Sequence, residues 1–336
     1  MKRALVVGAN GFLGSHVTRQ LVADGAEVRV MVRPTANTRS IDDLEVSRFH
    51  GDVFDTATLR AAMDGCEDVY YCVVDTRAWL RDPSPLFRTN VEGLRNVVEV
   101  AKQANLRSFV FTSTYATVGR RRGRVATEDN RIVRRRLTPY VRSRVQAEDL
   151  VLRSATQDGL PAVAMCVSTT YGSGDWGRTP HGAFIAGAVF GKLPFMMKGI
   201  RLEVVGVDDA ARALILAAEH GCNGERYLVS ERMIPLQEVV RIAADEAGVP
   251  PPRRSISVPA LYGLGALGSL RTRFTGKEAE LSLASVRMMR AEAELDHSKA
   301  VRELGWRPRP VEESIREAAR FWADLRNARG KSATPG

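Results

Sequence analysis

The chain has 336 residues, of which 44% are apolar and 26% charged, and its formal net charge is +10. This composition is ordinary for a globular protein and excludes a largely disordered chain. No stretch of 18 residues is continuously apolar, and the four scattered cysteines form no C-x-x-C pair, which argues against a membrane span, a zinc site and a disulfide framework. We therefore expect a cytoplasmic protein without a metal.

Short apolar runs alternate with helical patterns through the first half of the chain. The patterns predict strands at 3–8, 27–33, 68–74, 108–113 and 161–167, and helices at 12–25, 56–64, 86–104 and 139–154. Such alternation is typical of a parallel sheet with helices on both faces. We expect an α/β fold, a Rossmann-type doubly wound parallel sheet, followed by a smaller C-terminal lobe.

A glycine-rich loop joins the first predicted strand to the first predicted helix. The sequence "VVGANGFLG" places Gly8, Gly11 and Gly14 in this loop. Glycines allow the backbone to approach a pyrophosphate, and the N-terminal end of a helix favours its charge. The loop therefore predicts a dinucleotide site made by Gly8, Asn10, Gly11, Phe12, Leu13 and Gly14.

The end of the second predicted strand indicates which dinucleotide is bound. An acidic residue here would bind the ribose hydroxyls of NAD, but this chain has Arg33 and no acidic residue from Val28 to Ile41. An arginine can bind a 2′-phosphate, so we predict NADP (NADPH) as the cofactor, with NAD less favoured. Further along, "GDV" supplies Asp52 and Val53, which we expect beside the adenine.

A candidate reacting group follows the fourth of these strands. Thr138 and Pro139 are typical of a helix start, which places Tyr140 in the first turn and Arg144 one turn later on the same face. Thr114 ends the preceding strand, at the edge where open sheets bind ligands. A phenol held between a hydroxyl and a cation can exchange a proton with a carbonyl oxygen.

These segments resemble the extended short-chain dehydrogenases/reductases of the NAD-dependent epimerase/dehydratase superfamily. The most similar branch holds dihydroflavonol reductases, 3β-hydroxysteroid dehydrogenases and the hopanoid-associated sugar epimerase family. The likeness covers nearly the whole chain, from "VVGANGFLGSHV" through "GDVFD", "VFTST" and "YVRSRVQAE" to "SKAVRELGWRPRP". It implies that Tyr140 is the general acid/base and Thr114 the hydroxyl that orients the substrate. It also implies that Arg144 replaces a lysine that holds the nicotinamide ribose and lowers the pKa of the tyrosine.

Three functions remain open. The first is an NADP-dependent oxidoreductase that interconverts a secondary alcohol and a ketone, acting as a reductase on a bulky apolar substrate. The second is a nucleotide-sugar epimerase or dehydratase, and the third is a non-catalytic NADP sensor. We expect an NADP-binding domain at 1–170, completed by a strand and a helix within 202–230. The substrate lobe is expected at 171–201 and 231–329, with a disordered tail at 330–336.

Two further segments suggest contacts with other molecules. The segment 119–136 holds eight arginines and is either a solvated loop or a surface that attracts anions. No aromatic residue is interleaved with these arginines, so we expect no nucleic-acid partner. The apolar segment 258–274 is either a helix buried in the lobe, the preferred interpretation, or a helix on a membrane surface. We expect a small-molecule substrate and a monomer or homodimer.

Overall fold

A central sheet of seven parallel strands organises the molecule. The computed structural model describes residues 2–275 except Arg122 and Arg136, the single residues Leu283 and Val286, and residues 293–332. The strands follow the order β10-β6-β5-β4-β1-β2-β3. They are β1 (Arg3–Val7), β2 (Glu27–Val32), β3 (Ser47–His50), β4 (Asp68–Tyr71), β5 (Ser108–Thr114), β6 (Ala162–Val167) and β10 (Arg226–Val229).

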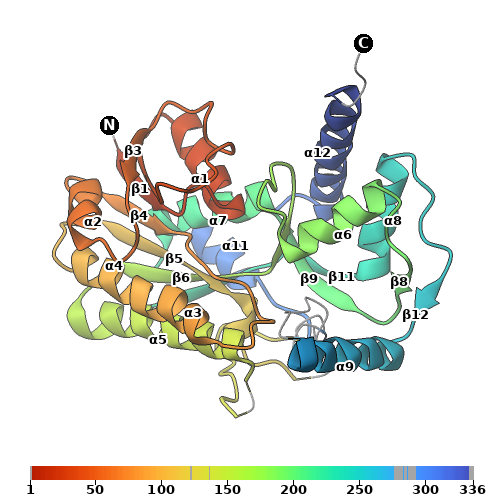
Figure 1. Ribbon diagram of the computed structural model, residues 1–336. Coiled ribbons are helices and arrows are strands. Elements are labelled where there is room, and N and C mark those ends of the chain that lie inside the picture. Colours follow the sequence, from red (N-terminus) through yellow and green to blue (C-terminus); the bar gives the residue numbers. More distant parts are fainter. Residues whose placement is uncertain are drawn as a thin grey trace.

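Helices cover both faces of this sheet (Figure 1). One face carries α1 (Phe12–Ala23), α7 (Val207–His220) and α11 (Ser298–Leu304), and the other carries α2 (Thr56–Met63), α4 (Leu94–Ala101) and α5 (Pro139–Asp158). Each face has its own apolar core, because the buried strands alternate their side chains between the two sides. The predicted doubly wound α/β fold is confirmed.

A smaller lobe packs against the carboxyl edge of the sheet. Its three-stranded sheet has the order β11 (Arg232–Pro235), β9 (Arg201–Gly206), β7 (Thr169–Tyr171), and β8 (Met196–Met197) pairs with β12 (Ser255–Ile256). A third apolar core joins these strands to α6 (Pro180–Val189), α8 (Leu236–Glu246) and α12 (Val311–Ser332). Helix α12 extends through residues 330–332, so the prediction of a disordered tail at 330–336 is wrong for these residues, and residues 333–336 lie outside the described residues.

Three segments differ from the sequence-based prediction. The edge strand β3 was missed because its sequence, "SRFH", has no apolar run. The helix predicted at 86–104 is divided into α3 (Ser84–Phe87), a π-helical turn η1 (Arg88–Gly93) and α4. The prediction of a buried helix at 258–274 is wrong. Helix α9 (Val258–Thr275) lies along the lower side in Figure 1, and only Leu261 and Gly265 of its residues are buried.

No helix among the described residues is long and apolar enough to cross a membrane. The four cysteines are free thiols, of which Cys222 alone is exposed. The described residues also contain no cluster of three or more potential metal-binding side chains.

Candidate active site

The glycine loop lies where the strand order reverses, between β1 and β4. Gly8 follows β1 with φ +88°, a backbone conformation that side chains disfavour. A Cβ on Gly14 would lie 2.3 Å from the carbonyl oxygen of Gly8, so only glycine fits there. Gly11 caps α1, and no side chain bonds the free N–H groups of the first turn. Since open sheets bind ligands at this switch point, the loop fits a pyrophosphate.

The predicted adenosine-side residues lie next to this loop. Arg33 directly follows β2 and is exposed, and its side chain has no polar partner in the described part of the chain. Asn10 ties the glycine loop to the same turn, because its side-chain amide donates to the carbonyl of Asn37 at 3.4 Å. Asp52 and Val53 follow β3 at the same edge, and the Asp52 carboxylate accepts only from the backbone N–H of Phe54, at 3.1 Å.

Thr114 and Tyr140 meet at the carboxyl end of β5. Thr138 caps α5 by accepting from the N–H of Val141, which places Tyr140 in the first turn as predicted. Burial raises the pKa of the Tyr140 phenol, whereas the charge of Arg144 and a hydrogen bond with Thr114 lower it. Burial has the larger effect on this pKa. Arg144 lowers the pKa, as the family resemblance implies, but the net shift is upward. The phenol is therefore protonated at neutral pH.

Arg144 lies one turn further along α5 and is buried. Its guanidinium donates from Nη2 to the carbonyl oxygen of Thr112, and its centre lies 5.0 Å from the centroid of the Phe111 ring. Its Nε and Nη1 atoms are buried without a partner in the described part of the chain. Buried charged donors without a partner are costly, and the described residues supply none for these two atoms.

The sequence analysis missed one residue that holds this site together, Asn90. It is fully buried in the π-helical turn η1 and bonds both the N–H and the carbonyl of Asp75, at 2.7 and 3.0 Å. It also donates to the hydroxyl of Ser143, which in turn donates to the carbonyl of Tyr140 at 2.8 Å. Asn90 thus fixes the turn after β4 to the first turn of α5. A π-helical turn, which is frequent at functional sites, has no local sequence signature that would have revealed it.

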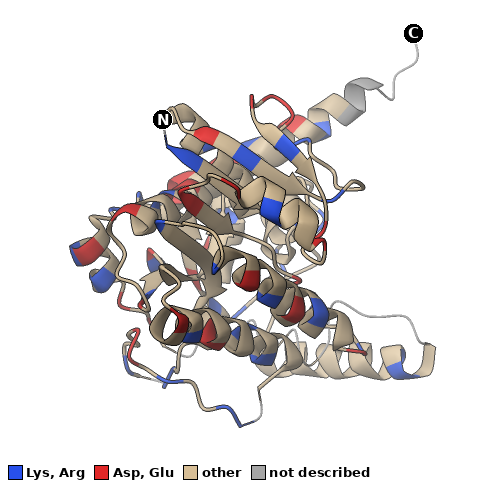
Figure 2. Ribbon diagram, turned by 90° about the vertical axis from the view of Figure 1, so that its left-hand side faces the viewer, with Lys and Arg blue, Asp and Glu red and all other residues tan. Residues whose placement is uncertain are grey.

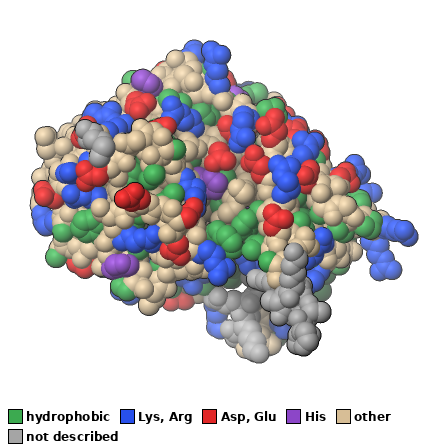
Figure 3. Space-filling model, turned by 90° about the horizontal axis from the view of Figure 1, so that it is seen from above, with side chains coloured by type: hydrophobic (Ala, Val, Ile, Leu, Met, Phe, Trp, Pro, Cys, Tyr) green, Lys and Arg blue, Asp and Glu red, His purple; other side chains and the backbone are tan. Residues whose placement is uncertain are grey.

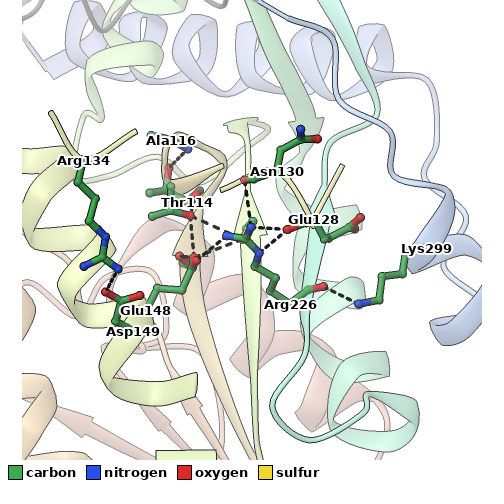
Figure 4. Close-up of polar contacts among 12 residues, drawn as sticks. Thr114, Ala116, Glu128, Asn130, Arg134, Glu148, Asp149, Arg226 and Lys299 are labelled. Carbon is green, nitrogen blue, oxygen red and sulfur yellow. Dashed lines mark hydrogen bonds and ion pairs between the residues drawn. The ribbon is translucent and has the colours of Figure 1, made fainter. Parts of the chain in front are cut away.

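A second missed feature is an ion pair behind Thr114, between Glu148 and Arg226 (Figure 4). Arg226 Nη1 donates to Glu148 Oε1 at 2.9 Å. The other oxygen, Oε2, accepts from the hydroxyls of Ser113 and Thr117 and from the thiol of Cys166. The Thr117 hydroxyl also lies 2.8 Å from the carbonyl oxygen of Thr114, so its single proton is shared between this carbonyl and Glu148. The carboxylate therefore ties α5 to the end of β5 that carries Thr114.

Arg226 extends this contact to the arginine-rich segment 119–136. Its guanidinium donates to the backbone carbonyls of Glu128 and Asn130, while the Glu128 side chain accepts from the N–H of Leu228 at 2.8 Å. Glu148 and Arg226 are 78 residues apart in sequence, so no local pattern could have indicated their ion pair.

The fold and this site define a nicotinamide-dinucleotide-binding protein of the Rossmann type. Residues 4–230 match the model of the NAD dependent epimerase/dehydratase family, and the chain belongs to this family, among the extended short-chain dehydrogenases/reductases. It is 27% identical to sterol demethylase protein B of Methylococcus capsulatus, over 95% of this chain and 98% of that protein.

Two further proteins are similar over almost their whole lengths. A ketoreductase of Stigmatella aurantiaca, named for a 4-hydroxy-2-methyl-3-oxo-4-farnesyl-3,4-dihydroquinoline-1-oxide substrate, is 26% identical over 95% of this chain and 96% of its own. The crystal structure of gox2253 superposes with a TM-score of 0.84 at 31% identity, covering 97% of this chain and 99% of that one. Relatives named as reductases and dehydrogenases support an oxidoreductase on this fold.

Proposed function

We propose that the protein is an NADP-dependent oxidoreductase that reduces a ketone to a secondary alcohol. The observation that carries the proposal is the cluster of Thr114, Tyr140 and Arg144 at the carboxyl edge of the sheet, the edge at which the glycine loop also lies.

The residues divide the chemistry between them. Bound NADPH would supply a hydride to the carbonyl carbon. Tyr140 would donate its proton to the carbonyl oxygen, which Thr114 would orient through a second hydrogen bond. Arg144 would hold the nicotinamide ribose and stabilise the phenolate that remains. A protonated phenol can donate its proton to the carbonyl oxygen of a ketone, which is the role we propose for Tyr140 in the reduction.

The choice of NADP rests on Arg33. It stands at the end of β2, where the adenosine ribose binds in this fold, and no carboxylate follows it before Asp42. A charge-assisted contact with a 2′-phosphate contributes about 1.5–3 kcal/mol, or about ten- to a hundredfold in affinity. We also retain the assignments of Asp52 and Val53 to the adenine. A cytoplasmic location and a monomer or homodimer stay predictions.

A bulky apolar substrate is supported by the space beside Tyr140. A cavity of ≈ 270 Å³ is lined by Ala78, Trp79, Leu80, Arg81, Pro139, Ser269, Thr272 and Arg273. The Tyr140 ring itself packs against Ala78 and Leu86. Relatives named for a sterol and for a farnesyl compound agree with an apolar ligand of this kind. We assign residues 171–201 and 231–329 to this substrate lobe, except α11 (Ser298–Leu304), which packs on the central sheet.

Loss of NADPH absorbance with a panel of apolar ketones tests the proposal. Turnover that Tyr140→Phe removes supports it. Tight NADPH binding without oxidation by any ketone would support the sensor instead. An epimerase would retain its cofactor and need no added NADPH.

A further inference from the structure

The outer face of helix α9 is unusually apolar for an exposed helix. Leu264, Leu267, Leu270 and Phe274 recur every three or four residues, so they lie on one face. Phe274 is 79% exposed and Leu267 62%. The helix contains no acidic residue, and its only charges, Arg271 and Arg273, lie in its last two turns.

The arginine-rich loop 119–136 adds two more exposed apolar side chains, Val125 at 59% and Val133 at 72% exposure. Among the described residues nine large apolar side chains are exposed, and six of them belong to α9 or to this loop. Exposed apolar residues are usually scattered, so their concentration in two segments indicates a contact surface. The loop and α9 lie on the same side of the molecule, the lower side of Figures 1 and 2.

The exposed charged side chains at the tip of the arginine-rich loop are basic. Arg121 and Arg124 are exposed at the tip of the loop, which has no acidic residue from 119 to 127. Of the two carboxylates that follow, Glu128 is buried and Asp129 is exposed, so the exposed charged side chains of the loop remain mostly basic. On the opposite face, acidic and basic side chains are interspersed (Figure 3).

We propose that the outer face of α9 and the tip of the loop form a docking surface for an anionic lipid bilayer. Leucine and phenylalanine side chains on one face of a helix enter the boundary between headgroups and acyl chains. Arginines beside them bind the anionic headgroups. A second copy of the chain would bring the same arginines together, so the bilayer is the better partner for this charge.

The same helix connects this surface to the proposed site. Ser269, Thr272 and Arg273, on the other side of α9, line the cavity that also touches Pro139, the neighbour of Tyr140. An apolar ketone dissolved in the bilayer would therefore reach the cavity past one helix. The docking itself does not depend on the proposed reaction and can be measured without cofactor.

Flotation of the full chain with phosphatidylcholine vesicles, with and without phosphatidylglycerol, tests the surface. We expect binding to the anionic vesicles that weakens with salt. The triple variant L267S/L270S/F274S should bind at least about tenfold more weakly, because a tenfold change corresponds to about 1.4 kcal/mol and burial of a single leucine or phenylalanine side chain contributes at least that much. The matched control V301S changes an exposed valine on α11 and should bind like the parent.

A second pair of variants separates charge from apolar contact. R121S/R124S should lose about thirtyfold in affinity for anionic vesicles, since each basic residue contributes about 1 kcal/mol at such a surface and about 1.4 kcal/mol is tenfold, and should not change binding to neutral ones. The triple variant should still oxidise NADPH with a water-soluble ketone, because its three residues do not line the cavity.

Three outcomes overturn the proposal. The first is that the parent does not float, and the second is that the parent and the triple variant float equally. The third is that neither protein floats and sedimentation shows a dimeric parent but a monomeric triple variant. The last outcome would assign the face to a second copy of the chain. If the parent floats but oxidises no NADPH, the docking surface stands and the proposed reaction fails.

Discussion

Two buried charged residues lie one turn apart on α5, and their surroundings differ completely. Arg144 is 1% exposed, makes one hydrogen bond and leaves two N–H groups unpaired. Glu148 is 5% exposed, and its two oxygens accept four donors, from Arg226, Ser113, Thr117 and Cys166. The fold completes the environment of the glutamate and leaves that of the arginine incomplete.

The two buried side chains therefore differ in whether other groups of the protein satisfy their polar atoms. Folded proteins pair nearly all buried polar groups, and Glu148 follows this rule whereas Arg144 does not. The paired carboxylate needs no ligand and holds β5, α5, β10 and the arginine-rich loop together (Figure 4). Variants of Tyr140 and Arg144 should therefore lose turnover or cofactor binding, whereas variants of Glu148 should lose stability.

Tyr140→Phe should give the largest effect, on turnover alone. Removal of the proton donor should lower kcat about 100- to 10,000-fold, the usual contribution of a general acid. The melting temperature should barely change, because the ring remains in contact with Ala78 and Leu86. Steady-state kinetics and calorimetry check both expectations. Unchanged turnover would refute the assignment of Tyr140.

Glu148→Ala should give the largest effect on stability. It removes the buried carboxylate from Arg226, whose side chain is 17% exposed, and loss of one partner of a fully buried pair typically costs about 3–5 kcal/mol, which is the upper limit expected here. Chemical denaturation measures this loss. Asp149→Ala is a matched control on the same helix, because its ion pair with Arg134 is exposed and is worth at most about 1 kcal/mol. Equal losses in the two variants would contradict a structural role for the buried pair.

Arg33→Asp should reverse the cofactor preference. A carboxylate repels the 2′-phosphate and can bind ribose hydroxyls, so the affinity for NADPH should fall about ten- to a hundredfold while that for NADH rises. Calorimetric titration of both nucleotides decides the matter. Arg39→Asp, in the same turn, controls for charge alone, and equal affinities of the parent for both nucleotides would end the NADP assignment.

Arg144→Met should give the smallest change in stability, of either sign up to about 1 kcal/mol, because it removes unpaired donors together with one hydrogen bond. Its cofactor affinity should nevertheless fall. Arg144→Lys keeps the charge and should retain turnover within about tenfold of the parent. A strong loss of stability in Arg144→Met would mean that the arginine is structural, like Glu148.

Local signals predicted the elements that position the site. The apolar runs predicted β1, β2, β4, β5 and β6, and the Thr138-Pro139 pair predicted the start of α5. The glycine spacing predicted the loop that the structure shows between β1 and α1.

The features that could not be predicted from the sequence depend on contacts between residues far apart in the chain. Asn90 acts through Asp75 and Ser143, and Glu148 acts through Arg226, so their roles exist only after folding. The exposure of α9 was mispredicted for a related reason, because an apolar helix has the same composition whether other residues cover it or not. The roles assigned to Thr114, Tyr140, Arg144 and Arg33 stay predictions until the variants are measured.

The arginine-rich loop, whose backbone carbonyls accept hydrogen bonds from Arg226, is also a site where a protease can cleave the chain. Exposed Arg121 and Arg124 are trypsin sites at a loop tip, where proteases act most readily. On either side of the tip the loop is held, because Gly119 donates to Asn130 at 2.8 Å and Val118 bridges to Arg131. β5 and β6, which lie on opposite sides of the cut, pair along six positions. A single nick should therefore give two peptides that stay associated as one particle, so the chain can be divided here into complementing fragments.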